Sequence, residues 1–304
     1  MKQPILSIVI PTRDNIEALR DGFLRSFVHN TSDVNNVELI FVVDEDDKKT
    51  INFLQKNDAL KHIAFFQLLI RERSKNITDD YYNYGAKKSN GFFVMPGADD
   101  IVIDTPNYDL LLIKTREGLI KTEGIHKKHY LLIKTYGEGN VGGEGFCCFP
   151  ILTRASIDTL GFFLAPSLIP SWGADWFIDK IYTTLNRVAT TKPAINITQW
   201  SCHNASKEPT KRDKENHNRM AHINRSVPDC KENPQLVLEI LTAIYHIVTE
   251  NIENYTPPGL WKAYESARLI NENVKGAVPG TRCPDIYLKI LWGIQQTLHD
   301  NYNR

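Results

Sequence analysis

The sequence predicts an α/β protein built around a largely parallel sheet. Strand-like and helix-like hydrophobic patterns alternate through the first hundred residues, and this alternation is typical of strands joined by helical crossovers. The apolar run Gly91–Met95 is followed by a Pro-Gly break and two adjacent acids, Asp99 and Asp100. Right-handed crossovers place the carboxyl ends of parallel strands on one edge, and open α/β sheets bind their ligands at that edge.

Each expected strand is a short, mostly apolar run that ends at turn-forming residues. These runs cover Leu6–Ile10, Val37–Val43, Ile63–Ile70 and Gly91–Met95. Pro11 is expected to stop the first of them. Apolar residues at helical spacing or runs of helix-forming residues predict helices between the strands, over Asn15–His29, Lys48–Asn57 and Asp79–Ser89.

Polar side chains follow three of these strands. Thr12, Arg13 and Asp14 come after the first strand, Asp44–Asp47 end the second, and Asp99-Asp100 follow the fourth. Turn formation is one explanation for each cluster, but their convergence on one edge favours a nucleotide site. Neither GxGxxG nor GxxxxGK[ST] is present, which disfavours a dinucleotide dehydrogenase and a P-loop NTPase. A divalent cation on the acid pair could instead neutralise a diphosphate.

Composition restricts the class of protein further. The 304 residues suffice for one large α/β domain with an appendage, and 36 basic residues balance 36 acidic ones, so no overall field attracts nucleic acid or an acidic membrane. Five cysteines without a CxxC pair predict reduced thiols rather than disulfides or a zinc ribbon. The absence of a signal peptide and of a long apolar run predicts a cytoplasmic protein without a membrane span.

The rest of the chain is less regular. The pentapeptide Leu-Leu-Ile-Lys-Thr occurs at 111–115 and again at 131–135, and both copies are interpreted as strands. Ala194–Gln199 is expected to form an edge strand. Residues 207–232 form a polar segment, interpreted as a linker or lid, and residues 233–304 carry apolar faces at helical spacing, which predict a helical C-terminal extension. Packing onto the core, homodimerisation and acceptor capture are the roles considered for these helices.

Five blocks of the sequence together resemble family 2 glycosyltransferases with the GT-A fold. In chain order the blocks are Leu6–Asp14, Phe41–Asp47, Asn83–Asp100, Phe149–Phe163 and Trp172–Lys180. The resemblance covers about residues 5–206. It implies that residues 1–206 form one GT-A domain with a Rossmann-like mixed sheet flanked by helices. It also implies an inverting transfer of a hexosyl or pentosyl group from a nucleotide-diphosphate sugar, UDP-sugar being favoured, to a hydroxyl acceptor.

The resemblance also implies a set of site residues. Those that would contact the nucleotide-sugar donor are Pro11, Thr12, Asp14, Asp44, Asn83 and Asp99. Asp99 and Asp100 would take the place of the family's DxD motif and bind Mn2+ or Mg2+, with His203 as a further metal contact. This chain departs from the motif, because Gly97 or Ala98 stands where the first acid is common. The departure puts metal dependence in doubt more than donor binding.

Asp175 is the candidate general base. Phe177, Ile178, Ile181 and Leu185 follow Ala174 at helical spacing, which predicts a buried helix face with Asp175 and Asp179 on another face. An acid in a first helical turn often only stabilises the helix dipole. The tryptophans on either side of Asp175 suit a sugar platform, and its position in the resembling block favours the catalytic role.

Two other functions stay open at this point. The protein could bind a nucleotide sugar without transferring it, or it could be a nucleotidyltransferase, although the expected glycine-rich loop with a basic residue is missing after the first strand. The acceptor class is also open, because saccharides, lipid-linked glycans, proteins and hydroxylated DNA bases all offer a hydroxyl group.

Overall fold

The structure is a computed structural model. It describes residues 3–74, 76–126, 128–137, 147–160, 162–164, 175, 178–179, 182 and 187–200. The predictions made for His203, for the polar segment 207–232 and for the helices of residues 233–304 lie outside the described residues, as do the tryptophans beside Asp175.

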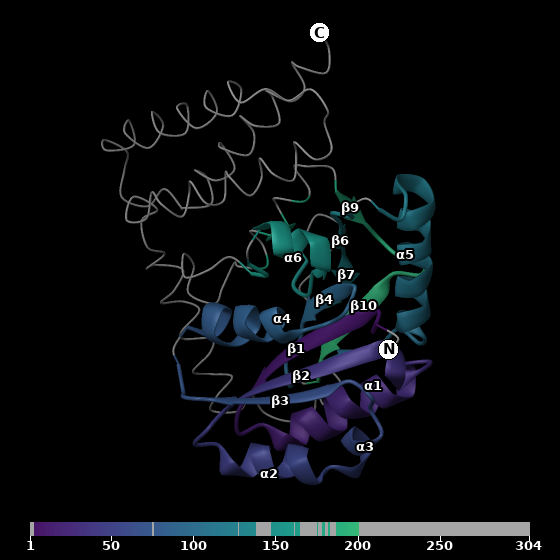
Figure 1. The fold of residues 1–304 in the computed structure, drawn as a ribbon. Helices are drawn as coiled ribbons and strands as arrows, with labels where there is room; N and C mark the ends of the chain where they lie inside the picture. Colours follow the sequence, from purple (N-terminus) through teal and green to yellow (C-terminus); the bar gives the residue numbers. More distant parts are fainter. Residues whose placement is uncertain are drawn as a thin grey trace, which may run out of the picture.

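A mixed seven-stranded sheet forms the centre of the molecule (Figure 1). Its strands, in spatial order, are β3 (Phe66–Arg71), β2 (Val37–Asp44), β1 (Leu6–Thr12), β4 (Phe93–Pro96), β8 (Ile151–Thr153), β6 (Leu132–Ile133) and β9 (Val188–Ala189). The strands β1 to β4 pair in parallel, whereas β8 is antiparallel to both of its neighbours. The predicted α/β class and the shared carboxyl edge of the first four strands are therefore confirmed.

Helices cover both faces of this sheet. Their bounds are η1 (Ala18–Leu24), α1 (Arg25–Asn30), η2 (Val34–Asn36), α2 (Lys48–Lys56), α3 (Asp58–Lys61), η3 (Thr78–Asn83), α4 (Tyr84–Lys88), α5 (Tyr108–Glu123) and α6 (Arg154–Leu160). In Figure 1, α1, α2 and α3 lie on one side of β1, β2 and β3, and α4 lies on the other. The elements η1 and η3 are π-helices that run directly into α1 and α4.

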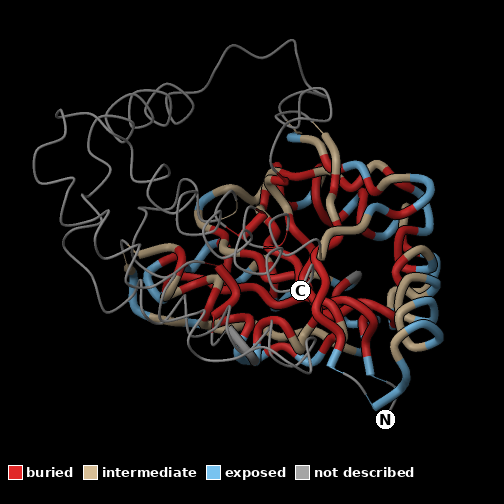
Figure 2. The backbone as a smooth tube through the Cα atoms, turned by 90° about the horizontal axis from the view of Figure 1, so that it is seen from above, coloured by how far each residue is buried: buried red, intermediate tan, exposed pale blue. Residues whose placement is uncertain are grey.

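The hydrophobic core follows the helix pattern read from the sequence. The side chains of Leu19, Phe23 and Phe27 are fully buried in one cluster with Ile8 and Phe41 of the sheet. Helix α4 approaches the opposite face so closely that a Cβ on its Gly85 would lie 2.4 Å from Val9. Figure 2 shows that buried residues concentrate along the strands, whereas the outer side of α5 is exposed.

A second sheet of three strands completes the described part of the chain. It has the order β5 (Ile101–Ile103), β10 (Ile195–Gln199) and β7 (Thr135–Tyr136). Because β10 lies in the centre, the prediction of an edge strand at Ala194–Gln199 is wrong. The backbone N–H of Trp200, just after β10, donates to the carbonyl of Asp100 across 2.7 Å. This bond fixes the end of β10 against the acid pair.

The two copies of Leu-Leu-Ile-Lys-Thr have different structures, so the interpretation of both as strands is wrong. Residues 111–115 lie inside α5, whereas residues 131–135 contain β6 and the start of β7. In the helical copy Leu112 packs into the core. In the second copy Leu132 and Ile133 pair with β8 on one side and β9 on the other. The partners available to each copy decide its conformation.

Pro11 does not end the first strand, contrary to the prediction. The pairing of β1 with β2 continues to Thr12, whereas the pairing with β4 ends at Val9 opposite Pro96. The carbonyl of Val9 accepts the N–H of Gly97 (2.8 Å), so the backbone polar groups of Val9 face β4. Pro11 faces the same way, because every second residue of a strand directs its backbone groups to the same side. The missing N–H of Pro11 falls beyond the end of that ladder, where no hydrogen bond is lost.

Candidate active site at the carboxyl edge of the sheet

The ends of β1 and β4 meet at Asp99. Its carboxylate is buried, and it accepts hydrogen bonds from the hydroxyl of Thr12 (2.9 Å) and the side-chain amide of Asn15 (2.8 Å). Both donors are neutral, so they orient the carboxylate of Asp99 without cancelling its negative charge. Pro11 lies half-buried just before this contact. The predicted convergence of Thr12 and Asp99 at one edge is present in the structure.

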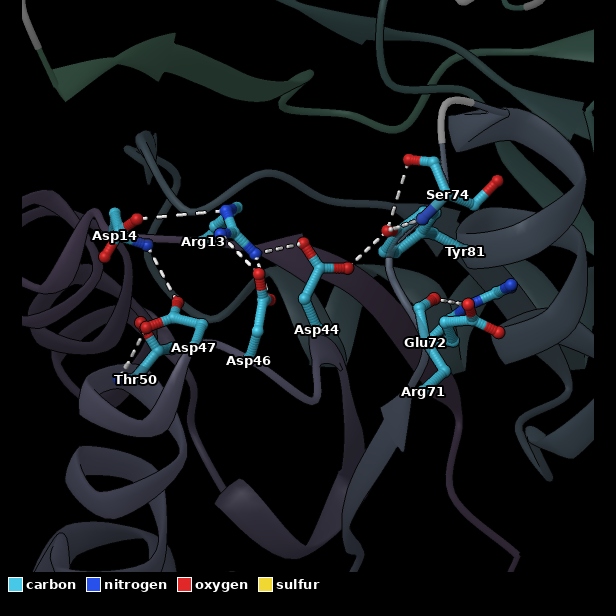
Figure 3. A network of polar contacts seen from close by, with 10 residues as sticks. All are labelled: Arg13, Asp14, Asp44, Asp46, Asp47, Thr50, Arg71, Glu72, Ser74 and Tyr81. Carbon is cyan, nitrogen blue, oxygen red and sulfur yellow. Dashed lines mark hydrogen bonds and ion pairs between the residues drawn. The ribbon is translucent and has the colours of Figure 1, made fainter.

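Arg13 joins the ends of β1 and β2 (Figure 3). Its guanidinium donates to Asp44 (2.7 Å) and bidentately to Asp46 (2.5 and 3.0 Å). These hydrogen bonds raise the pKa of Arg13 above its ordinary value and lower that of the Asp46 carboxyl. Asp44 is almost fully buried, and its other oxygen accepts the hydroxyl of Tyr81. Asp44 is thus held rigidly from both sides.

The turn after β1 is fastened to the start of α2. Asp14 adopts a left-handed backbone conformation with φ of 51°, which Asp tolerates better than most residues. Its N–H donates to Asp47 (2.9 Å), and Asp47 also caps α2 by accepting the N–H of Thr50 (3.2 Å). The side chain of Asp14 is exposed, so it faces solvent at the rim of the carboxyl edge.

The turn between β4 and Asp99 passes very close to the sheet. A Cβ at Gly97 would lie 2.7 Å from Ile8 and 3.0 Å from Ile10, both in the packed core. Any side chain at position 97 would therefore collide with buried atoms. If the altered motif is counted from Asp99, its first acid would fall at position 97, where these contacts leave no room for a side chain. The carbonyl of Gly97 accepts the hydroxyl of Tyr82 across 2.8 Å.

Tyr82 connects the acid pair with Asp175 electrostatically. Burial raises the pKa of the Tyr82 phenol, and the charges of Asp100, Asp99 and Asp175 raise it further. Asp175 lies in a helical turn and is half-buried. Burial and then the charge of Asp175 also raise the pKa of the Cys148 thiol to about 12. Three carboxylates from two distant parts of the chain are therefore close enough to act on one hydroxyl.

Asp179 differs from Asp175 in its surroundings. Its side chain is fully buried, and its carboxylate forms an ion pair with Lys134 (3.0 Å). The prediction that both acids lie away from the buried helix face is wrong for Asp179. A fully buried carboxylate paired with Lys134 is closed to an approaching acceptor, which leaves the half-buried Asp175 as the candidate base of the two.

Asn83 is buried and its amide group is fully engaged within the protein. The amide nitrogen donates to Asp79 (2.9 Å) and to the carbonyl of Leu164 (2.9 Å). The amide oxygen accepts the N–H groups of Phe163 and Leu164 (2.8 and 2.9 Å). An Asn side chain has two donor hydrogens and two acceptor lone pairs, so these four bonds use its capacity. Its expected contact with the donor stays a prediction.

The described residues can be tested for their fit to a divalent metal. Within these ranges no group of three or more His, Cys, Asp or Glu side chains is arranged to hold an ion. Mg²⁺ in nucleotide enzymes is commonly bound by one or two carboxylates together with substrate phosphates. The pair of Asp99, buried, and Asp100, half-buried, meets that smaller requirement. Metal binding would therefore depend on a bound diphosphate.

The sequence reasoning missed three residues of this edge. Asn15, Tyr81 and Tyr82 each donate a hydrogen bond to an acid or to the turn that carries the acids. A Tyr-rich helix was expected at 79–89, but nothing in the local pattern indicates which tyrosine faces the sheet edge. No helix in the described ranges has the length and apolarity required to cross a membrane.

Comparison with known proteins gives limited similarity. Neither protein-family models nor curated proteins match this chain. Among solved structures, residues 1–349 of S. aureus TarS in complex with UDP are 14% identical, with 98% of this chain and 91% of that chain covered and a TM-score of 0.49. The complex with UDP-GlcNAc has a TM-score of 0.48 at the same identity and coverage.

A second similar structure is the mannosyltransferase PcManGT from Pyrobaculum calidifontis in complex with GDP-Man and Mn2+. It is 11% identical, with 99% of this chain and 88% of that chain covered and a TM-score of 0.47. Similarity at this level does not assign an activity to this chain.

Proposed function

We propose that this protein is an inverting glycosyltransferase of the GT-A type, which transfers a sugar from a nucleotide-diphosphate donor to a hydroxyl. The observation that carries the proposal is the position of Tyr82. Its hydroxyl is affected by the charges of Asp99 and Asp100 at the end of β4 and by that of Asp175. Acids that suit a diphosphate-bound cation and an acid that suits a general base therefore lie near one side chain.

The donor half of the site would use the ends of β1, β2 and β4. Asp44, held by Arg13 and Tyr81, would bind the base or ribose, and uridine is the favoured base. Asp99, oriented by Thr12 and Asn15, would bind the ribose or the metal. Groups that are locked before the ligand arrives lose less conformational entropy on binding, which supports a preformed nucleotide site.

The acceptor half would depend on Asp175. A general base must reach the proton that it removes and must be ionised at the working pH. Asp175 is half-buried, so an acceptor hydroxyl can approach it while part of its surface is shielded from water. It would take the proton of the attacking hydroxyl as the oxygen attacks the sugar from the face opposite the diphosphate, which inverts the anomeric centre.

A divalent cation, Mn2+ or Mg2+, would be held by Asp100 with the help of Asp99. When bound, it would offset the negative charge that develops on the leaving diphosphate. Both oxygens of Asp99 accept hydrogen bonds, from Thr12 and Asn15, which fix the orientation of this carboxylate beside Asp100. The free thiols Cys147 and Cys148 favour a reducing compartment such as the cytoplasm.

One observation favours a second candidate, a nucleotide-sugar-binding protein without transferase activity. Position 97 has no room for a further acid, and a metal site that lacks this ligand would bind a donor more readily than it would activate one. The two candidates share the donor half of the site and differ in what Asp175 does.

A donor screen tests the proposal. UDP-, GDP-, CDP- and dTDP-sugars are added with and without Mn2+, and thermal unfolding is recorded. A ligand at 100 times its dissociation constant adds about 2.7 kcal/mol of stability. One stabilising nucleotide sugar that is also hydrolysed or transferred supports a glycosyltransferase. Stabilisation without turnover supports the binding protein, and no stabilisation by any sugar nucleotide contradicts both.

A further inference from the structure

We propose that Tyr82 and Asn83 are positioning residues that tie the acid turn, residues 97–100, to the segment that leads to Asp175. The two residues end the π-helix η3. They contact different segments, because Tyr82 bonds to Gly97 whereas Asn83 bonds to Phe163 and Leu164. The inference rests on the proposed function, because it assigns these residues the task of holding the donor acids and the base at a fixed separation. They are called here the η3 clamp.

Tyr82 holds the donor side of the clamp. Its hydroxyl donates to the carbonyl of Gly97 across 2.8 Å, and the N–H of the same Gly97 donates to Val9 across 2.8 Å. Gly97 is also wedged against Ile8 and Ile10 of β1. The peptide that precedes the acid pair is therefore fixed from the sheet and from η3 at once. The Tyr82 bond connects this turn to η3, the element that also carries Asn83.

Asn83 holds the other side of the clamp. Its amide makes three hydrogen bonds to the backbone of Phe163 and Leu164, and these residues precede Asp175 in the same stretch of chain. Asp79 fixes the orientation of the Asn83 amide (2.9 Å), and the side-chain amide of Asn76 in turn donates to Asp79 (2.8 Å). A side chain held in this way can transmit position between η3 and residues 163–164.

The geometry of the clamp matters for the reaction. The sugar carbon must lie between the leaving phosphate and the attacking hydroxyl, so the distance from the acid pair to the base sets the transfer geometry. A displacement of about 1 Å can reduce turnover by roughly 100-fold. π-helical turns inside longer helices recur at functional sites, and η3 carries both halves of the clamp on adjacent residues.

Two variants separate the halves of the clamp. Tyr82→Phe removes one hydroxyl and keeps the ring, and Asn83→Ser removes the amide. Each has a matched control at the other edge of the sheet. Tyr108→Phe deletes a fully buried hydroxyl that is bonded to Thr31 (3.0 Å). Asn36→Ser deletes a buried amide that donates to Asp109 (2.9 Å).

The expected effects differ between the two halves. Asn83→Ser should lower turnover by roughly 100-fold and leave the dissociation constant of the donor unchanged, because it acts on the Asp175 side. Tyr82→Phe should weaken Mn-dependent donor binding by up to about tenfold, the equivalent of one hydrogen bond, and lower turnover as well. In an Asp175→Asn background, Asn83→Ser should cause little further loss of turnover. The controls, Tyr108→Phe and Asn36→Ser, should lower the stability of the protein but leave turnover and donor affinity unchanged.

Amide hydrogen exchange supplies a readout that needs no activity. In Tyr82→Phe the amide exchange of residues 97–100 should become faster. In Asn83→Ser the amide exchange of residues 162–164 should become faster. The exchange of β1 should stay unchanged in both variants. Unchanged exchange in both segments would overturn the clamp. The clamp would also be overturned if Asn83→Ser lowered turnover in the Asp175→Asn background by the same factor as in the wild type. A loss of donor affinity in Asn83→Ser without a loss of turnover would overturn it as well. If the wild-type chain neither binds nor transfers any sugar nucleotide, the proposed function fails, and the exchange data still decide the clamp.

Discussion

The hydroxyl of Thr12 lies 2.9 Å from a carboxylate oxygen of Asp99, although 87 positions separate the two residues in the chain. The hydrogen bond connects the end of β1 with the turn after β4, two strands that pair in parallel at the centre of the sheet. The side-chain amide of Asn15, three residues after Thr12, donates a hydrogen bond to the other carboxylate oxygen of Asp99. The first acid of the pair is thus oriented by the end of the first strand and the start of the first helix.

The proposed base gives the first prediction. Asp175→Asn keeps the size of the side chain but removes the basic oxygen, so turnover should fall by roughly 10²- to 10⁴-fold. The dissociation constant of the donor should barely change, because the interaction is made in the transition state. Single-turnover kinetics and donor titration measure the two quantities.

Asp179→Asn is the comparison for Asp175→Asn. This variant breaks the buried ion pair with Lys134, so it should lower the melting temperature while transfer by the folded protein continues. Near-normal turnover in Asp175→Asn, with only a small loss of stability, would show that Asp175 is a helix-start acid.

A second prediction concerns the donor acids. Asp44→Ala should weaken donor binding with and without Mn2+, because Asp44 is assigned to the nucleotide. Asp100→Ala should abolish only the enhancement by Mn2+, because Asp100 is assigned to the ion. Isothermal titration with the best donor from the screen measures both. If donor affinity and its dependence on Mn2+ are unchanged in the two variants, the donor site lies elsewhere.

A third prediction concerns Gly97. Gly97→Ala places a methyl group against Ile8 and Ile10 in the core, so it should lower the free energy of unfolding by about 1–3 kcal/mol. Gly118→Ala, in the exposed interior of α5, meets nothing within 4 Å and should instead add up to about 1 kcal/mol. Urea unfolding measures both changes. A Gly97→Asp variant that is stable and binds Mn2+ more tightly would contradict the steric account of the altered motif.

A fourth prediction concerns the pH dependence of stability at Asp109. This carboxylate is fully buried and accepts hydrogen bonds from two groups of Ser32, from the N–H of Asp33 and from Asn36. Burial tends to raise the pKa of Asp109, but these bonds hold it below its ordinary value. The stabilisation is therefore present above the unfolded-state pKa of about 3.9 and is lost as the pH falls through the lower folded-state pKa.

Asp109→Asn isolates this contribution. The variant should be less stable than the wild type by about 1–3 kcal/mol near neutral pH, and the difference should shrink in acid as the wild-type carboxyl becomes protonated. Urea unfolding at pH values on both sides of about 3.9 measures it. Asp58→Asn serves as the control, because Asp58 is exposed beside Lys61. A difference between wild type and Asp109→Asn that stays constant with pH would show that the charge of Asp109 does not contribute.

The early strands and helices could be predicted from the sequence because their patterns are local. Leu19, Phe23 and Phe27 repeat at the spacing of one helix face, and all three are buried. The runs at 6–10 and 37–43 are apolar except for Ser7 and Glu38, which bond to each other, because β1 and β2 are buried along nearly their whole length. Parallel pairing then follows from the intervening helix, and it brings Thr12, Asp44 and Asp99 to one edge.

The sequence by itself therefore determined the α/β class, the shared carboxyl edge and most of the acids gathered there. Tertiary structure decided which of the two Leu-Leu-Ile-Lys-Thr segments is a helix, why Gly97 excludes a third acid, and that Tyr82 and Asn83 contact residues far along the chain. The hydrophobic pattern of the sequence predicts which side of a helix or strand is buried. It does not predict which distant residues pack against that side, and the three features above depend on those contacts. A hydrogen bond such as Tyr82 to Gly97 exists only once the sheet and η3 have packed together.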